Sequence, residues 1–355
     1  MIPFAIIGTG WRAEFYLRVA RACPTRFKVA GLVSRAGNPA LESRFGVKTY
    51  PDIESLLRAA KPRFVVTSVP WAANPGLVKA LVAKGVPVLS ETPPAPDLAG
   101  MEELFRFVRR RKGLVQVAEQ VHLRPLHQAQ ARVARDGRLG VPREAYVSVS
   151  HGYHGISLMR RLLGLGVENA VITGSRFTSP VIQGDTRQGP PAKEALVPSA
   201  RDFYGFNFGD KMGVIDFTGA QYFGRIRGGH LQVRGERGEL ANERVTWLRD
   251  FRTPLQAALE RVNEGEGDDL HAAGLLGYRI DGRWVYRNPF GAGTGLMDDE
   301  IAIGEMLIRM DAAVRTGREF YPLAEGCQDH YLYLLAQEAV ATGRPVKSRA
   351  RVWAR

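Results

Sequence analysis

Short hydrophobic runs alternate with amphipathic stretches along the first third of the chain. The hydrophobic runs are rich in Val, Leu, Ile and Phe, and they comprise Pro3–Ile7, Val29–Val33, Phe64–Val69, Val86–Leu89 and Leu114–Ala118. The stretches between them have apolar residues at helical spacing, and they comprise Trp11–Cys23, Asp52–Ala60, Asn74–Lys84 and Asp97–Arg111. Strands that alternate with helices in this way predict a doubly wound parallel sheet, whose ligand lies beyond the carboxyl ends of the strands.

The pattern changes after Ala118, where a further helix is predicted to run to Asp136. Strands then predominate, at Ala145–Val149, Ala170–Phe177, Met212–Phe217, Gln221–Ile226, Leu231–Val233 and Val245–Leu248. Two helices close the chain, at about Asp298–Thr316 and Glu325–Thr342. Two segments rich in Gly, Pro and polar residues are predicted to be loops, Thr178–Ser199 and Gly265–Gly274. This part of the chain is therefore predicted to be α+β, with an open, mainly antiparallel sheet.

A glycine-rich turn joins the first predicted strand to the first predicted helix, with the sequence Gly8-Thr9-Gly10-Trp11-Arg12-Ala13. In this context Gly8 allows a tight turn, Gly10 lets the backbone approach a pyrophosphate, and the small Ala13 lets the helix pack closely on the sheet. Unpaired N–H groups and the helix dipole then favour the phosphates. A plain strand–turn–helix with small residues is the simpler alternative. We predict an NAD(P)-binding Rossmann domain over residues 1–121 and a substrate-binding or oligomerisation domain over residues 122–355.

The second strand ends at Ser34 and Arg35, where an acidic residue would mark NAD. A hydroxyl and a guanidinium suit a 2′-phosphate instead, so the sequence favours NADP(H) over NAD(H), the alternative being a solvated loop arginine. The predicted cofactor-binding residues are Gly8, Thr9, Gly10, Trp11, Arg12, Ala13, Ser34, Arg35, Ser68, Val69, Pro70, Asn74, Glu91, Thr92, Pro93 and Gln120. Of these, Asn74 is also predicted to cap the helix that follows it.

Composition narrows the possible partners. The chain has 355 residues and a net charge of +13, but its basic residues are scattered, and the densest cluster, 109–112, closes a predicted helix. Neither nucleic acid nor a membrane is an expected partner, because no basic stripe is interleaved with aromatic residues and no apolar run approaches the roughly 20 residues of a membrane helix. The two cysteines, Cys23 and Cys327, lie far apart and predict no disulfide framework or metal site. We expect a cytoplasmic protein without a signal peptide.

Several motifs together make the chain resemble the Gfo/Idh/MocA oxidoreductase family. They are the glycine turn, Val88-Leu89-Ser90-Glu91-Thr92-Pro93, Gly137-Arg138-Leu139-Gly140, His154 heading a helix that ends in Leu162-Leu163-Gly164, and Val233-Arg234-Gly235-Glu236-Arg237-Gly238. The resemblance covers essentially the whole length. It implies NAD(P)-dependent oxidation or reduction of sugars, polyols and related carbonyl compounds, and a homodimer or homotetramer formed through the C-terminal sheet. Some members of the family carry out redox-assisted glycoside cleavage.

The chain departs from the family at two of the three familiar catalytic positions. The family's Glu-Lys-Pro is Glu91-Thr92-Pro93 here, and Ser150 replaces the aspartate of Asp-x-Gly-x-His. Hydride transfer needs a proton acceptor beside the carbinol oxygen. The resemblance leaves His154 as the main proton-transfer residue, with His151 and Tyr153 in orienting roles, although a histidine at a helix start is often only a cap.

Weaker substrate-binding candidates are Thr92, His122, Arg124, Tyr204 and Lys211. Lys211 could supply the missing ammonium group, although a charge at a strand edge is its simpler interpretation. Three functions stay open: an NADP(H)-dependent oxidoreductase, a redox-assisted glycoside-cleaving enzyme with a tightly held cofactor, and a nucleotide-binding sensor or partner subunit without turnover.

Overall fold

The first part of the chain is a parallel α/β sandwich. The computed structural model describes residues 1–266 and 269–354. The sheet consists of β1 (Ile2–Ile7), β2 (Phe27–Val33), β3 (Thr49–Tyr50), β4 (Phe64–Thr67), β5 (Val88–Ser90) and β6 (Val115–Val117). The helices that join these strands are α1 (Trp11–Ala22), α2 (Pro39–Phe45), α3 (Ile53–Ala59), α4 (Asn74–Ala83) and α5 (Leu98–Arg111). The strand order β3-β2-β1-β4-β5-β6 confirms the predicted doubly wound sheet. All of its strands are parallel, and the chain switches from building one half of the sheet to building the other between β1 and β4.

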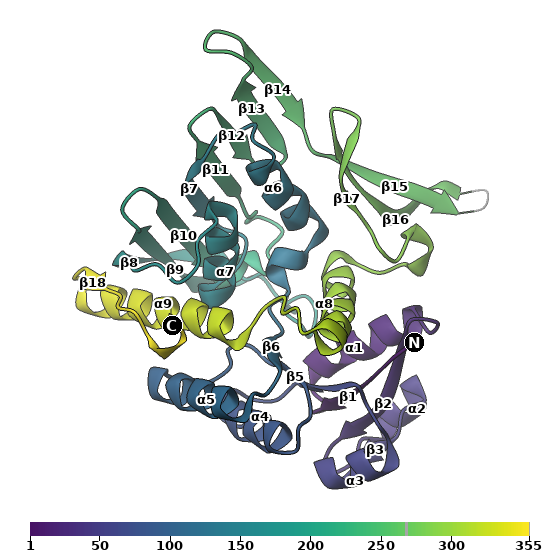
Figure 1. Cartoon of the computed structure of the whole chain (residues 1–355). Helices are drawn as coiled ribbons and strands as arrows, with labels where there is room; N and C mark the ends of the chain where they lie inside the picture. Colours follow the sequence, from purple (N-terminus) through teal and green to yellow (C-terminus); the bar gives the residue numbers. More distant parts are fainter. Residues whose placement is uncertain (267–268, 355) are drawn as a thin grey trace.

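A nine-stranded sheet dominates the second part of the chain (Figure 1). Its strands are β7 (Pro142–Val147), β8 (Val171–Ile182), β9 (Leu196–Asn207), β10 (Met212–Thr218), β11 (Leu231–Gly235), β12 (Gly238–Ala241), β13 (Arg244–Leu248), β14 (Pro254–Ala258) and β18 (Val346–Lys347). Only β7 and β10 pair in parallel; the other neighbouring strands are antiparallel. Because this sheet is open and mainly antiparallel, it confirms the predicted α+β architecture.

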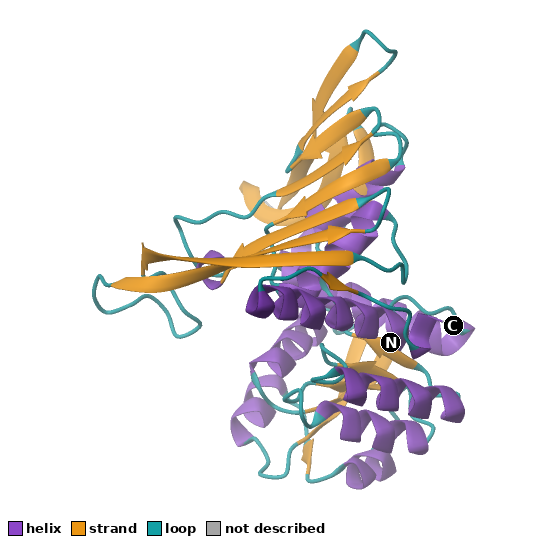
Figure 2. Ribbon diagram, turned by 90° about the vertical axis from the view of Figure 1, so that its left-hand side faces the viewer, coloured by secondary structure: helices purple, strands orange, loops and turns teal. Residues whose placement is uncertain are grey.

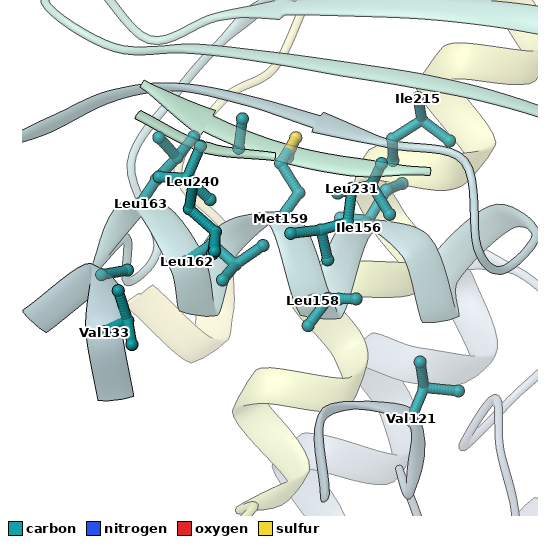
Figure 3. Close-up of a cluster of buried hydrophobic side chains, with 14 of the residues drawn as sticks. Val121, Val133, Ile156, Leu158, Met159, Leu162, Leu163, Ile215, Leu231 and Leu240 are labelled. Carbon is teal, nitrogen blue, oxygen red and sulfur yellow. The ribbon is translucent and has the colours of Figure 1, made fainter. Parts of the chain in front are cut away.

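Helices cover one face of the large sheet, and the other face is open (Figure 2). The covering helices are α6 (Pro125–Arg135), α7 (Gly152–Leu163) and α9 (Leu323–Thr342). The core between helices and sheet contains Ile156, Met159, Leu162, Ile215 and Leu240, all fully or almost fully buried (Figure 3). A separate small sheet, β15 (Glu260–Glu266), β16 (Asp269–Ile280) and β17 (Arg283–Arg287), projects to the right in Figure 1.

The C-terminal helices complete the core of the six-stranded parallel sheet. Ile303 and Met306 of α8 (Asp298–Thr316) belong to the same buried cluster as Phe4 of β1 and Leu17 of α1. On the opposite side of the sheet, Cys327 and Tyr331 of α9 are buried with Val117 of β6. The two parts of the chain therefore share hydrophobic cores, and the division at residue 121 stays a prediction.

Three local predictions were wrong. Residues 178–182 and 196–199, predicted as loop, extend β8 and β9, which pair in register from Val171 with Asn207 to Ile182 with Leu196. Gly265–Gly274 is largely the hairpin β15–β16, with residues 267–268 outside the described part. Polar and Pro residues are misleading in β8 and β9, because these strands are largely exposed there and the alternation of apolar and polar residues is weak. Gln221–Ile226 is not a strand. Gln221 ends a 3-10 turn, Gly219–Gln221, and its side-chain oxygen accepts from the Thr218 N–H.

Candidate functional site

The glycine turn between β1 and α1 has the shape of a phosphate cradle. Gly8 has φ +110°, and a Cβ there would lie 2.1 Å from the carbonyl oxygen of Ser68, so only glycine fits. A Cβ at Gly10, the N-cap of α1, would meet no atom within 4 Å. Ala13 is fully buried against the sheet. The Ser68 hydroxyl, just after β4, is buried and has no hydrogen-bond partner among the described residues, so the turn offers space beside an unsatisfied polar group.

The loop after β2 carries an exposed arginine, Arg35. The Ser34 hydroxyl donates to the Gly37 carbonyl at 3.2 Å and shapes the turn. Arg35 is exposed and has no ion pair among the described residues. Its guanidinium is available to a 2′-phosphate, and the preference for NADP(H) stays a prediction.

Asn74 does not cap α4, which corrects the prediction made for it. The helix N-cap is Ala73, and Asn74 is the first helical residue, fully buried. Its amide donates to the Ser90 hydroxyl at 3.0 Å and to the Pro94 carbonyl at 3.1 Å, while its oxygen accepts from Thr67. Asn74 thus joins the loops after β4 and β5, and its side chain is fully engaged by protein groups.

A carboxylate–imidazole pair lies at the start of α7. The Nδ1 atom of His154 is 2.5 Å from the Oε2 atom of Glu119, which follows β6 and is 2% exposed. The other carboxylate oxygen of Glu119 accepts from the Val121 N–H at 2.9 Å. A carboxylate only accepts, so Nδ1 of His154 donates and its Nε2 is left for another partner. The sequence analysis missed Glu119; its only signal was a carboxylate at the carboxyl end of a strand.

His151 and Tyr153 surround the His154 ring. The ring centroids of His151 and Tyr153 lie 5.0 and 4.4 Å from that of His154. Burial, and then the charge of His154, lowers the pKa of His151 to about 3, so His151 is neutral at physiological pH. The Tyr222 hydroxyl, which the sequence analysis did not single out, contacts Nδ1 of His151. The Tyr153 hydroxyl is 3.4 Å from the Thr92 carbonyl oxygen, and burial raises the pKa of Tyr153.

Polar residues from α1 and from the loops after β5 and β6 lie between the cradle and this histidine cluster. Arg12 donates to Gln120 Oε1 at 2.6 Å. Burial raises the pKa of Glu91, an effect that the charge of Arg12 opposes. The Glu91 carboxylate accepts from the Thr92 N–H at 2.9 Å. The structure therefore brings predicted cofactor residues and predicted catalytic residues to one place between the two sheets.

The side chains of four weaker substrate candidates are engaged by other protein groups. The Lys211 ammonium donates to the Leu163 carbonyl at 2.7 Å, at the end of α7 opposite His154, so it does not replace the missing lysine. The remaining side chains are engaged by other groups: Tyr204 donates to Asp202, His122 stacks on Tyr321, and Arg124 forms a bidentate pair with Asp299. Thr92 lines a small pocket with Glu119 and Tyr153.

Comparisons with known proteins agree with this geometry. Residues 2–119 match the family model GFO_IDH_MocA, described as an oxidoreductase family with an NAD-binding Rossmann fold. No curated protein matches the chain.

Solved structures share the fold over the whole chain. An oxidoreductase from Agrobacterium radiobacter, in complex with NAD+, L-tartaric acid and magnesium, has a TM-score of 0.68 at 16% identity, covering 97% of this chain and 98% of its own. The WlbA dehydrogenase from Bordetella pertussis, in complex with NADH and UDP-GlcNAcA, has a TM-score of 0.64 at 14% identity, covering 99% of each chain. A putative myo-inositol dehydrogenase from Sinorhizobium meliloti 1021 has a TM-score of 0.66 at 15% identity, covering 98% of this chain and 99% of its own.

The described residues contain neither a membrane-spanning helix nor a metal-binding cluster. Within residues 1–266 and 269–354, none of the helices has the length and apolar character needed to cross a membrane. The same part of the chain holds no group of three or more His, Cys, Asp or Glu placed to bind a metal ion.

Proposed function

We propose that this chain, whose residues 2–119 match the family model, is a member of the Gfo/Idh/MocA oxidoreductase family and an NAD(P)-dependent oxidoreductase acting on CH–OH groups. The substrate is a small sugar-, polyol- or related carbonyl-type molecule. The nicotinamide ring of the bound dinucleotide supplies the hydride acceptor or donor. The cradle formed by Gly8, Gly10 and the start of α1 fits the dinucleotide, and the free Arg35 favours NADP(H) over NAD(H).

The proposed oxidoreductase activity is supported mainly by the Glu119–His154 pair. Oxidation of a carbinol requires a group that takes its hydroxyl proton. Glu119 holds the proton on Nδ1 of His154, so Nε2 can accept the substrate proton, and the buried carboxylate offsets the positive charge that the ring gains. Thr92 can hydrogen-bond a substrate hydroxyl but cannot act as a base without help. His154 therefore replaces the family's lysine as the main proton-transfer group.

The open face of the large sheet supports a homodimer or homotetramer in a cytoplasmic enzyme. Register places Val171, Phe177, Phe203 and Met212 on the same face, and each of these apolar side chains is at least 37% exposed. An apolar face of this kind on a sheet is typical of a protein–protein contact. Size-exclusion chromatography with light scattering tests this part of the proposal.

A nucleotide-binding sensor without turnover is the second candidate, because Thr92 stands where the family has lysine. Redox-assisted glycoside cleavage with a retained cofactor is a further alternative. Cofactor absorbance, followed during a screen of sugar-, polyol- and hydroxy acid-type compounds, separates the first proposal from both. Net reduction of NAD(P)+ supports the oxidoreductase, product formation without net reduction supports glycoside cleavage, and binding without either supports the sensor.

A further inference from the structure

Two loops of the large domain reach down to the cofactor cradle. We name the segments 183–195, which follows β8, and 219–230, which follows β10, the roof loops. They are joined to each other by the ion pair between Arg225 and Asp185 at 2.9 Å. They also approach closely, since a Cβ at Gly184 would lie 3.4 Å from the Gly224 Cα atom. The roof loops therefore form one connected unit above the start of α1.

Arg187 of the roof loops stacks on the first residue of α1. Its guanidinium carbon lies 3.9 Å from the Trp11 ring centroid and 5.9 Å from that of Phe223, in the second roof loop. Both Arg187 and Trp11 are exposed, and Arg187 forms no ion pair with a carboxylate in residues 1–266 and 269–354. The aromatic rings fix the position of the cation without neutralising its charge.

The Arg187 guanidinium is a positive charge beside the N-terminus of a helix, where negative charges are favoured. The N-terminus of α1 carries a partial positive charge, so a second cation beside it is unfavourable when it stands alone. An anion bound between the two reverses the sign of that interaction. The adjacent turn provides the space, since within residues 1–266 and 269–354 a Cβ at Gly10 would meet no atom within 4 Å and the buried Ser68 hydroxyl has no partner.

We infer that Arg187 is a cofactor-binding residue supplied by the large domain, whose guanidinium binds the pyrophosphate of the dinucleotide and closes the roof loops over it. This inference rests on the proposed dinucleotide binding. A guanidinium forks onto phosphate oxygens, and its preformed stack on Trp11 lowers the cost of ordering the side chain. NADH, NADPH and ADP-ribose share the pyrophosphate, so Arg187 strengthens the binding of all three equally. Arg35, by contrast, acts on the 2′-phosphate that only NADPH carries.

Titration of wild type, Arg187→Ala and Arg35→Ala with NADH, NADPH and ADP-ribose tests the assignment. We expect Arg187→Ala to raise the Kd of all three ligands by roughly tenfold or more and to speed the release of NADH, as expected for a lost charged hydrogen bond. Arg35→Ala should weaken NADPH alone. Arg227→Ala is the matched control, because it removes the same charge from a roof loop, where the guanidinium donates to the Ile226 carbonyl at 3.3 Å and forms no ion pair with the described residues. Its Kd values should stay within twofold of wild type.

Arg187→Lys keeps the charge without the fork and should lie between wild type and Arg187→Ala. Unchanged Kd values in Arg187→Ala, or a loss confined to NADPH, overturn the assignment while leaving the proposed function intact. If wild type binds none of the three ligands, the proposed function and this inference both fail. Equal losses in Arg187→Ala and Arg227→Ala reduce the effect to general charge and also overturn the assignment.

Discussion

At the scale of single residues, the sequence predicts the histidines and the tyrosine of the candidate site but not its carboxylate, Glu119. His151, Tyr153 and His154 are within four residues of one another, so a motif finds them. Glu119 is 35 residues away from His154, on a different element, and only the packing of α7 beside the end of β6 brings them together. Local sequence patterns carry no information on such a contact. Lys211, a weaker candidate, donates to the Leu163 carbonyl at the end of α7 opposite His154.

The choice between cofactors depends on Arg35. We predict that NADPH binds more tightly than NADH to wild type, and that Arg35→Ala loses roughly tenfold to hundredfold in NADPH affinity, because a charged hydrogen bond contributes about 1.5–3 kcal/mol. Fluorescence titration of both nucleotides measures this. Equal affinities in wild type, or unchanged NADPH binding in the variant, would show that Arg35 is a solvated loop residue.

The two glycines of the cradle should respond differently to substitution. Gly10→Val should abolish dinucleotide binding while leaving the melting temperature near that of wild type, because its side chain enters space that only a ligand would fill. Gly8→Ala should unfold at lower temperature, since its Cβ would collide with the Ser68 carbonyl at a φ of +110°. Calorimetry and NADH titration of both variants check this. Normal NADH binding by Gly10→Val would place the phosphates elsewhere.

At the scale of elements, long amphipathic helices and buried strands are the most predictable parts. The bounds of α8 coincide with the predicted Asp298–Thr316, because apolar side chains along the helix, Ile303 to Met310 among them, are buried against the six-stranded sheet. The small elements α2 and β3 were missed, since a helix of seven residues and a strand of two have too little periodicity to read. The extended ends of β8 and β9 were missed because they pair mainly with each other and face solvent.

A buried charge network fixes α7 against α9. The Arg160 guanidinium is 2.5 Å from Oδ1 of Asp329 and 2.9 Å from Oε2 of Glu325, and the Tyr321 hydroxyl donates to Asp329. Asp329→Ala leaves the Arg160 cation buried without its main partner. We predict a loss of roughly 3–5 kcal/mol in the free energy of unfolding, measured by guanidinium chloride titration. The control is Glu103→Ala, which removes the exposed partner of Lys79 and should cost less than about 1 kcal/mol. Similar losses in the two variants would contradict this role of the network.

At the scale of the whole molecule, stability should depend on pH through a buried histidine away from the site. Burial lowers the pKa of His127 to about 4, below the unfolded value of 6.5. Between these two values the unfolded chain binds a proton that the native chain does not, so stability falls as pH falls from 6.5 to 4. The full contribution is roughly 3 kcal/mol. Asp329 acts in the opposite sense, because burial raises its pKa to about 6, so the wild-type curve alone is not diagnostic.

Comparison of wild type with His127→Gln isolates this effect. Chemical unfolding at a series of pH values should give a shallower loss of stability toward acid pH in the variant. Parallel curves for the two proteins would show that His127 titrates alike in the folded and unfolded chains.

The central claim is that His154, oriented by Glu119, moves the proton that accompanies hydride transfer. The most direct measurement is the pH–rate profile of kcat for wild type and His154→Ala, with a substrate found by the cofactor-absorbance screen and with NAD(P)H affinity measured in parallel. General acid–base groups contribute about a hundredfold to ten-thousandfold, so His154→Ala should lose that much turnover and one limb of the profile, with cofactor affinity retained. Glu119→Gln should lower kcat in the same direction, and His151→Ala and Tyr153→Phe should cost less. Intact turnover with an unchanged pH profile in His154→Ala would contradict the account.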